Sequence, residues 1–254
     1  MNGPARLLLD LLFPPRCVFC GRVLAARERD LCAQCRRTLP WLEGADAEQD
    51  GEWFALCVSP LRYQGAVRDS LHRYKFKGRQ AYHRAYGRLL AQCVRDHLAD
   101  RYDLISWVPL SRERRRERGY DQAFLLCAAT ALELGDVAVE TLRKGRDTAV
   151  QSRLEGEARR RANVLGAYAA VEPELVRDKR VLLVDDIITT GSTFSECARV
   201  LRSAGAKEVL CAALARVGFG RIVQSGYPIL GALCAALLLL LALPARQDAS
   251  MSAR

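Results

Sequence analysis

The sequence predicts an α/β fold in which a parallel β-sheet is flanked by helices. A small metal-binding module precedes this domain and a hydrophobic helix follows it. Three observations lead to this prediction: a buried-strand pattern at residues 181–184 that continues into a turn, a helix and another strand, two C-x₂-C pairs near the N-terminus, and a long uncharged run near the C-terminus. The predicted parts are residues 1–45, 52–217 and 218–254.

The net charge of +10 favours anionic partners such as phosphates, nucleic acid or a membrane surface. A basic surface that serves only solubility is the alternative. Ten cysteines occur without a signal peptide before them, since the apolar residues 7–13 are too short for one and lead into two prolines. This favours a reducing compartment, the cytoplasm, where cysteines serve metals or cores rather than disulfides.

The first motif consists of two C-x₂-C knuckles, Cys17 with Cys20 and Cys32 with Cys35. Four thiolates from two such turns can surround one tetrahedral Zn²⁺. A segment this short and charged cannot bury a core of its own, so a metal would stabilise it. Four cysteine ligands leave no open position, which predicts a structural zinc. Two unrelated pairs of reduced cysteines are the alternative.

A strand is expected at residues 55–63, followed by helices at 65–77 and 81–98. Residues 73–78, Arg-Tyr-Lys-Phe-Lys-Gly, alternate aromatic and cationic side chains. Such a pattern can stack bases and neutralise phosphates. The alternative is that the aromatic side chains face the core while the lysines extend along its surface.

Residues 103–109 predict a strand that leads into an arginine-dense loop at 111–121, with a helix at 124–134 after it. Five guanidinium groups in seven positions repel one another unless an anion lies among them. A pyrophosphate would fit, with Arg112, Arg116 and Arg118 as candidate ligands. The alternative is a solvated run of charge.

Residues 142–163 form a further basic, polar segment that contains two glycines. Its composition is typical of a lid that closes over a phosphate substrate. An exposed loop without that role is the alternative. A strand pattern resumes at residues 164–170.

The segment on which the functional interpretation depends is residues 181–193, Val-Leu-Leu-Val-Asp-Asp-Ile-Ile-Thr-Thr-Gly-Ser-Thr. The apolar run predicts a strand that ends at Asp185 and Asp186. Thr193 and Glu196 match a capping box, which predicts the start of a helix that ends near Gly205, with a strand at 208–217 after it. Free amides at the helix start favour a phosphate, and the carboxylates favour ribose hydroxyls or Mg²⁺.

This pattern resembles the signature of the type I phosphoribosyltransferases, which bind phosphoribosyl pyrophosphate (PRPP) together with Mg²⁺. The resemblance implies that Asp185 and Asp186 hold the ribose hydroxyls and are the candidate catalytic residues. It implies that the 5′-phosphate is bound by the turn, namely Thr189, Thr190, Gly191, Ser192 and Thr193. A response-regulator receiver also has a strand that ends in two acids, but it carries them near its start rather than in the last third of the chain. An acid pair with a purely structural role is the alternative.

The motifs together resemble the ComF family, in which a phosphoribosyltransferase domain follows a zinc ribbon. They are, in order, the knuckles, Tyr63-Gln-Gly65, Lys75-Phe-Lys-Gly78, Val108-Pro-Leu-Ser-Arg112, Arg118-Gly-Tyr-Asp-Gln122, Gln151 with Arg161 and Asn163, and the acid pair with its turn. The resemblance covers about residues 7–216. It implies a cytoplasmic protein of natural transformation that works near incoming single-stranded DNA and a competence helicase. It implies no established reaction.

The chain departs from that family after Arg216. Residues 227–245 carry no charge, and 19 helical residues at 1.5 Å each span about 28 Å, close to the thickness of a hydrocarbon core. A C-terminal anchor in the inner membrane is one interpretation. A frame-shifted or read-through tail and a helix packed on the protein are the others.

Two classes of function follow. One is a Mg²⁺-dependent phosphoribosyltransferase. The other is a module that keeps the PRPP-type fold but binds nucleic acid or a DNA-uptake partner.

Overall fold

The strand that carries the acid pair, β7 (Arg180–Ile188), lies inside a mostly parallel sheet in the computed structural model, which describes residues 13–145 and 166–218. The strand order is β1-β2-β8-β7-β4, and β3 pairs with the end of β8. Every pairing in this sheet is parallel except that of β1 with β2. The other strands of this sheet are β1 (Glu48–Gln49), β2 (Leu56–Val58), β3 (Leu61–Arg62), β4 (Leu104–Trp107) and β8 (Glu208–Arg216).

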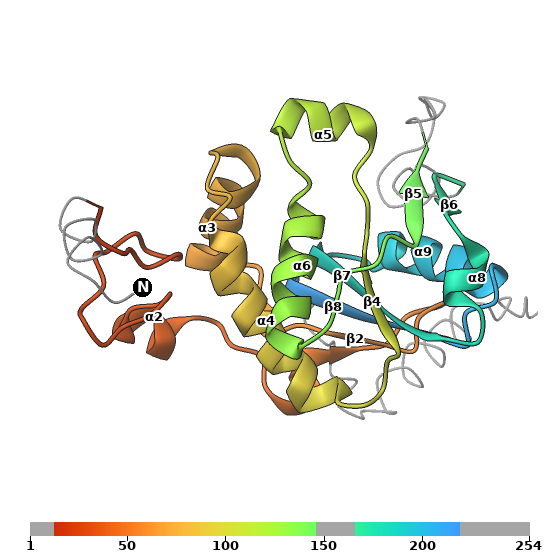
Figure 1. The fold of residues 1–254 in the computed structure, drawn as a ribbon. Helices are drawn as coiled ribbons and strands as arrows, with labels where there is room; N and C mark the ends of the chain where they lie inside the picture. The colour runs from red at the N-terminus through yellow and green to blue at the C-terminus, as the bar shows by residue number, and fades with distance from the viewer. Residues whose placement is uncertain (1–12, 146–165, 219–254) are drawn as a thin grey trace, which may run out of the picture. The chain divides into compact units, whose positions relative to one another are not determined.

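The helices cover both faces of the sheet, and the alternating side chains of β7 show which helices lie on which face. Leu182 and Val184 belong to the core under α3, α4 and α6, whereas Val181 and Leu183 belong to the core under α9 (Figure 1). A strand buried on both faces has no polar side, which is why its sequence is continuously apolar. The predicted parallel α/β architecture is therefore confirmed. The helices are α2 (Ala33–Thr38), η1 (Gly44–Ala47), α3 (Gly65–Phe76), α4 (Tyr82–Leu98), α5 (Arg112–Arg118), α6 (Gln122–Leu134), α8 (Pro173–Val176) and α9 (Ser192–Ser203).

Helices α4 and α6 pack closely because α4 has a glycine at the contact. A Cβ added to Gly87 would lie 2.6 Å from the Cβ of Ala129. No side chain fits there without moving one helix. A separate antiparallel pair, β5 (Leu142–Lys144) and β6 (Tyr168–Ala170), lies beside α9.

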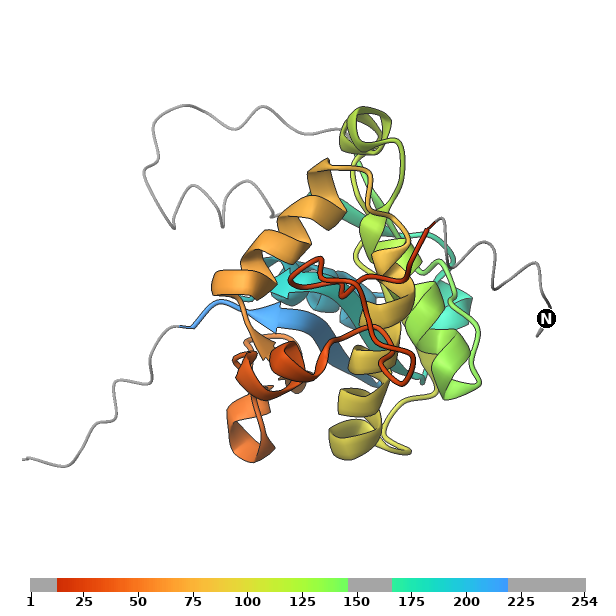
Figure 2. The ribbon, with the colours of Figure 1, turned by 90° about the vertical axis from the view of Figure 1, so that its left-hand side faces the viewer.

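The N-terminal module packs on α3 and α4 and shares their core. Val18, Phe19, Leu24 and Leu31 are buried in the same cluster as residues of both helices. Figure 2 shows this segment, in red and orange, beside α3 and α4. The module therefore rests on the larger domain rather than standing apart from it.

Three local predictions were wrong. The arginine-dense loop is a helix, α5, because the Ser111 hydroxyl accepts from the Arg114 amide at its start and Gly119 adopts φ 76° at its end. Arginine favours helices, and none of the α5 side chains is buried, so solvent screens their repulsion. The strand predicted at 55–63 is divided into β2 and β3 at Ser59 and Pro60.

The third error concerns the helix after the acid pair. Helix α9 begins at Ser192 after Gly191, and no side chain caps it. Glu196 accepts from the Gly166 amide at 2.7 Å and pairs with Arg199, so it does not complete a capping box. The helices predicted at 65–77, 81–98 and 124–134 are confirmed as α3, α4 and α6.

Most of the predicted lid and the predicted C-terminal anchor at 227–245 lie outside the described residues. Within the ranges 13–145 and 166–218, no helix is long and apolar enough to cross a membrane.

Candidate functional site

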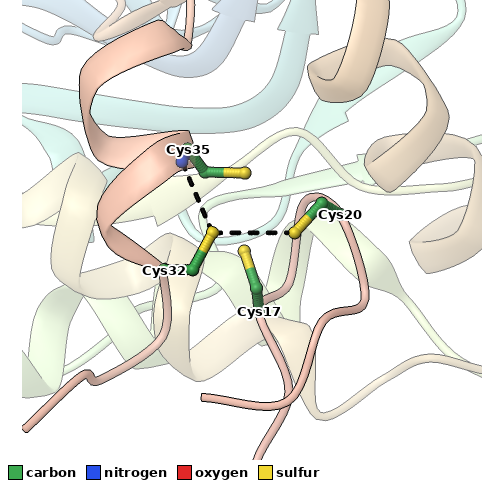
Figure 3. A group of neighbouring side chains, drawn as sticks. All are labelled: Cys17, Cys20, Cys32 and Cys35. Carbon is green, nitrogen blue, oxygen red and sulfur yellow. Dashed lines mark hydrogen bonds between the residues drawn. The ribbon is translucent and has the colours of Figure 1, made fainter. Parts of the chain in front are cut away.

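The four predicted zinc ligands come together in one cluster (Figure 3). The sulfur atoms of Cys17, Cys20, Cys32 and Cys35 all lie within 4.8 Å of one another, and the Cys20 and Cys32 sulfurs are 3.7 Å apart. A tetrahedral zinc with Zn–S bonds of about 2.3 Å separates its sulfurs by about 3.8 Å, so the cluster fits that metal.

Local backbone geometry aims the sulfurs inward. Gly21 adopts φ 78° directly after the first knuckle, and its amide donates to the Cys17 carbonyl at 2.9 Å. Cys32 is the N-cap of α2, and its sulfur accepts from the Cys35 amide at 3.4 Å. Because both turns are closed by their own backbone, the four thiolates are positioned for a structural metal.

The strand predicted to end at the acid pair continues to Ile188, so Asp185 and Asp186 lie within β7 and their side chains point to opposite faces of the sheet. Asp186 faces α3, where its Oδ1 lies 2.7 Å from Lys75 Nζ. Asp186 is only 3% exposed. Its Oδ2 is buried and has no hydrogen-bond partner within the part of the chain that the structure describes. A buried carboxylate oxygen without a donor is costly unless a ligand supplies one.

Asp185 points toward the α9 face and is partly buried. Its Oδ1 accepts from the Asp186 amide at 2.7 Å. Burial raises the pKa of Asp185, and the charge of Asp186 raises it further, whereas Lys75 lowers it. The carboxyl group is therefore easier to protonate than a solvent-exposed aspartate.

A third carboxylate, Asp121, lies near the pair and raises the pKa of Asp185 slightly. It caps α6 by accepting from the Phe124 amide at 3.1 Å, and it also accepts from the Leu110 amide. Burial raises the pKa of Asp121 itself. Asp121 thus connects the loop after β4 to α6 beside the acid pair.

The turn after β7 presents hydroxyls and open amides. The Thr190 and Ser192 hydroxyls are 2.7 Å apart, and Gly191 adopts φ 79°. The Thr193 and Phe194 amides, in the first turn of α9, donate to no acceptor in the described parts of the chain. Unpaired amides at a helix N-terminus bind anions well.

The three predicted pyrophosphate ligands on α5, Arg112, Arg116 and Arg118, divide into two groups. Arg112 and Arg116 line a cavity of about 800 Å³, together with Arg143, Lys144 and the acidic Glu113 and Glu117. Arg118 instead lies over the ring of Phe76, 5.0 Å from its centroid. Among the described lining residues, none comes from residues 185–193. The structure therefore places Arg112 and Arg116 on one cavity and Arg118 on the ring of Phe76.

Sequence reasoning missed Lys75 and Asp121 as neighbours of the acid pair. Lys75 stands in the Lys-Phe-Lys-Gly motif and Asp121 in the Gly-Tyr-Asp-Gln motif, so each had a signal. The two motifs did not indicate that their residues lie beside the acid pair in the folded protein. Tyr120 donates to the Tyr74 carbonyl and Tyr74 donates to the Gln122 carbonyl at 2.8 Å, which holds the second motif against α3.

Comparisons with known proteins found matches to both the N-terminal cysteine module and the larger α/β domain. A phosphoribosyl transferase domain model matches residues 122–232, and a double zinc ribbon domain model matches residues 8–47. Competence protein F of Haemophilus influenzae is 29% identical over 223 residues, which cover 79% of this chain and 96% of that protein. DNA utilization protein YhgH of Salmonella typhimurium is 34% identical over 204 residues, which cover 76% of this chain and 86% of that protein. Competence protein ComFC of Streptococcus pneumoniae is 30% identical over 154 residues, which cover 61% of this chain and 65% of that protein.

Proposed function

This chain belongs to the ComF family, and on that premise we propose that it serves DNA uptake with a site for PRPP at residues 185–193. The observation that carries the proposal is that the site offers a ligand both an unpaired hydrogen-bond acceptor and unpaired donors. Asp186 offers a buried carboxylate oxygen without a partner within the described ranges, and α9 offers open amides at Thr193 and Phe194. A ribose 5-phosphate complements both, because its hydroxyls donate and its phosphate accepts.

In this arrangement Asp186 accepts from the ribose hydroxyls, Asp185 lies beside it on the α9 face of β7, and the turn from Thr189 to Thr193 binds the 5′-phosphate. Arg112 and Arg116 then meet the pyrophosphate from the α5 cavity. Arg118, the third predicted pyrophosphate ligand, packs over the ring of Phe76. The divalent metal, Mg²⁺, would neutralise the pyrophosphate, and Asp185 and Asp186 are the nearby carboxylates whose chemistry fits such an ion.

Phosphoribosyl transfer is the reaction that such a site would support. The bond from C1 of the ribose to pyrophosphate breaks, and an acceptor forms a new bond to C1. Catalysis would be electrostatic and positional, since the charge develops on the ribose and the pyrophosphate. No side chain in the described site is placed as a general base, so the proton that the acceptor loses would pass to solvent or to the departing pyrophosphate.

Isothermal titration tests the proposal. We expect zinc-loaded protein to bind PRPP with Mg²⁺, and to bind ribose 5-phosphate more weakly. Asp186→Asn should weaken both, because it replaces an acceptor oxygen with a donor. Asp69→Asn, at an exposed position on α3, is the matched control. No heat with PRPP for the wild type would overturn the proposal.

Binding of single-stranded DNA is a second candidate function. One observation favours it: Phe76 is 57% exposed and lies beneath Arg118, while Tyr74 of the same motif is fully buried. An exposed ring among cations can stack an unpaired base. Labelled single-stranded DNA at two salt concentrations tests this by fluorescence anisotropy, because binding through phosphates weakens steeply with salt. Three further parts of the proposed function rest on the sequence alone. They are a competence helicase as partner, a cytoplasmic location and a membrane contact through residues 227–245.

A further inference from the structure

Helix α3 contacts the zinc cluster on one side and the acid pair on the other. Arg73 donates to the carbonyls of Val18 and Phe19, at 3.2 and 2.6 Å. The Ser70 hydroxyl also donates to the Val18 carbonyl. Val18 and Phe19 are the two residues between the ligands Cys17 and Cys20, so α3 binds the backbone of the first zinc knuckle.

The opposite side of the same helical turn contacts the acid pair. Two residues along a helix correspond to a rotation of about 200°, so Lys75 points away from the side on which Arg73 lies. Lys75 is the residue that pairs with Asp186. One turn of α3 therefore joins the knuckle to the carboxylate that we assign to the ribose.

Packing makes this turn rigid. Phe19 and Tyr86 are buried with ring centroids 6.0 Å apart, and the Ser70 hydroxyl lies 2.6 Å from the Tyr86 hydroxyl. Tyr74 is fully buried and contacts Tyr86 edge-on. Closely packed interiors transmit displacements rather than absorb them.

We propose that zinc occupancy and ribose-phosphate affinity are coupled through α3, with Arg73 as the positioning residue. A bound metal holds the knuckle carbonyls where Arg73 reaches both. Without it the knuckle is held only by its own backbone and by its contacts with α3 and α4, so its carbonyls can shift away from Arg73, and the last turn of α3 then no longer fixes Lys75 on Asp186. The ligand in this inference rests on the proposed function, but the connection between knuckle and helix does not. Coupling of this kind is reciprocal, so the sugar phosphate must also retain the zinc.

The experiment uses the full chain and three variants. Arg73→Met keeps an unbranched apolar stem but removes the guanidinium donors, and Arg73→Lys restores one cationic donor. Arg68→Met is the matched control, because Arg68 lies on the same helix, is exposed and, among residues 13–145 and 166–218, forms its ion pair with its neighbour Asp69. Three quantities are measured: PRPP affinity with and without zinc, the rate of zinc release to a coloured chelator with and without PRPP, and amide hydrogen exchange of α3 and α9.

For the wild type we expect zinc removal to weaken PRPP binding about tenfold, and PRPP to slow zinc release. Zinc-loaded Arg73→Met should bind PRPP about as weakly as the zinc-free wild type, and PRPP should no longer slow its zinc release. Exchange should accelerate in the second half of α3 but not in α9, which separates this effect from general unfolding. Arg73→Lys should recover part of each effect, and Arg68→Met should match the wild type.

The outcomes separate this inference from the proposed function. Wild-type PRPP affinity that does not depend on zinc, together with unchanged α3 exchange in Arg73→Met, would overturn the coupling and leave the PRPP site standing. If the zinc-loaded wild type binds no PRPP, the proposed function fails, and the α3 exchange still decides whether the knuckle positions the helix.

Discussion

Lys75 Nζ lies 2.7 Å from Asp186 Oδ1, and this ion pair joins α3 to the central strand. The side chain of Lys75 is 18% exposed and that of Asp186 is 5% exposed, so water solvates neither well. Removing one member of such a pair leaves a charge that is buried and unpaired. The pair therefore stabilises the fold at the same place where we expect the ligand.

Lys75→Met should destabilise the protein by about 3 kcal/mol or more, since Asp186 then has no counter-charge. Urea denaturation at neutral pH measures this change. The double variant Lys75→Met with Asp186→Asn should recover part of the loss, and Lys77→Met, at the exposed end of α3, should change little. Additive effects of the two substitutions would contradict an energetic pair.

Asp185 should make the protein less stable as the pH rises. Its pKa is raised to about 8 by burial and by the charge of Asp186, from about 4 in an unfolded chain. The folded state then binds more protons than the unfolded state between these values, so the free energy of unfolding falls with pH by at most about 1.4 kcal/mol per unit. Asp185→Asn should flatten that slope between pH 5 and 8 in denaturation curves. An identical slope in the two proteins would show that Asp185 titrates normally.

Gly191→Ala tests the turn. Gly191 adopts φ 79°, where an L side chain is strained by about 1–2 kcal/mol. We expect that loss of stability together with weaker binding of ribose 5-phosphate, because relief of the strain moves the amides of α9. Gly119 has φ 76° and open space around it, so Gly119→Ala should cost similar stability without changing ribose 5-phosphate affinity. Equal affinities in both variants would argue against the turn as the phosphate site.

Arg112→Met combined with Arg116→Met should separate pyrophosphate recognition from ribose phosphate recognition. Each arginine that loses a charge-assisted contact costs about 1.5–3 kcal/mol. PRPP affinity should therefore fall by about a hundredfold or more in calorimetry, whereas ribose 5-phosphate affinity should stay within about twofold. Arg114→Met, on the same helix but not among the described residues that line the cavity, is the control. An equal loss of affinity for PRPP and for ribose 5-phosphate would contradict a specific role of the two arginines in binding the pyrophosphate.

Cys35→Ser should release the metal. We expect one zinc per chain in the wild type by elemental analysis and none in the variant, because a tetrahedral site loses a quarter of its ligands. The N-terminal module should then become sensitive to proteases, as it loses zinc binding that contributes on the order of 10 kcal/mol in small domains. Cys127→Ala, at a buried cysteine outside the cluster, should keep its zinc. Retention of zinc by Cys35→Ser would contradict a four-cysteine site.

The sequence by itself determined the features that depend on neighbouring residues. The C-x₂-C spacing placed the sulfurs of each knuckle on one short turn, and the run from Val181 to Gly205 contained a strand, a turn and a helix in order. Such patterns are local, because a few adjacent side chains and backbone angles settle them. Even here the capping box predicted at the start of α9 was wrong, because Glu196 accepts from the Gly166 amide and pairs with Arg199 instead.

Only the tertiary structure decided which distant residues meet. In the structure Lys75 pairs with Asp186, Arg73 donates to the zinc knuckle and Arg118 lies over Phe76. The structure also showed that the predicted arginine-dense loop is a helix. These contacts depend on how helices pack over a sheet, where many small interactions act together across long stretches of chain. No spacing along the sequence contains that information, which is why the sequence could place the acid pair on a buried strand but could not identify its counter-charge, Lys75.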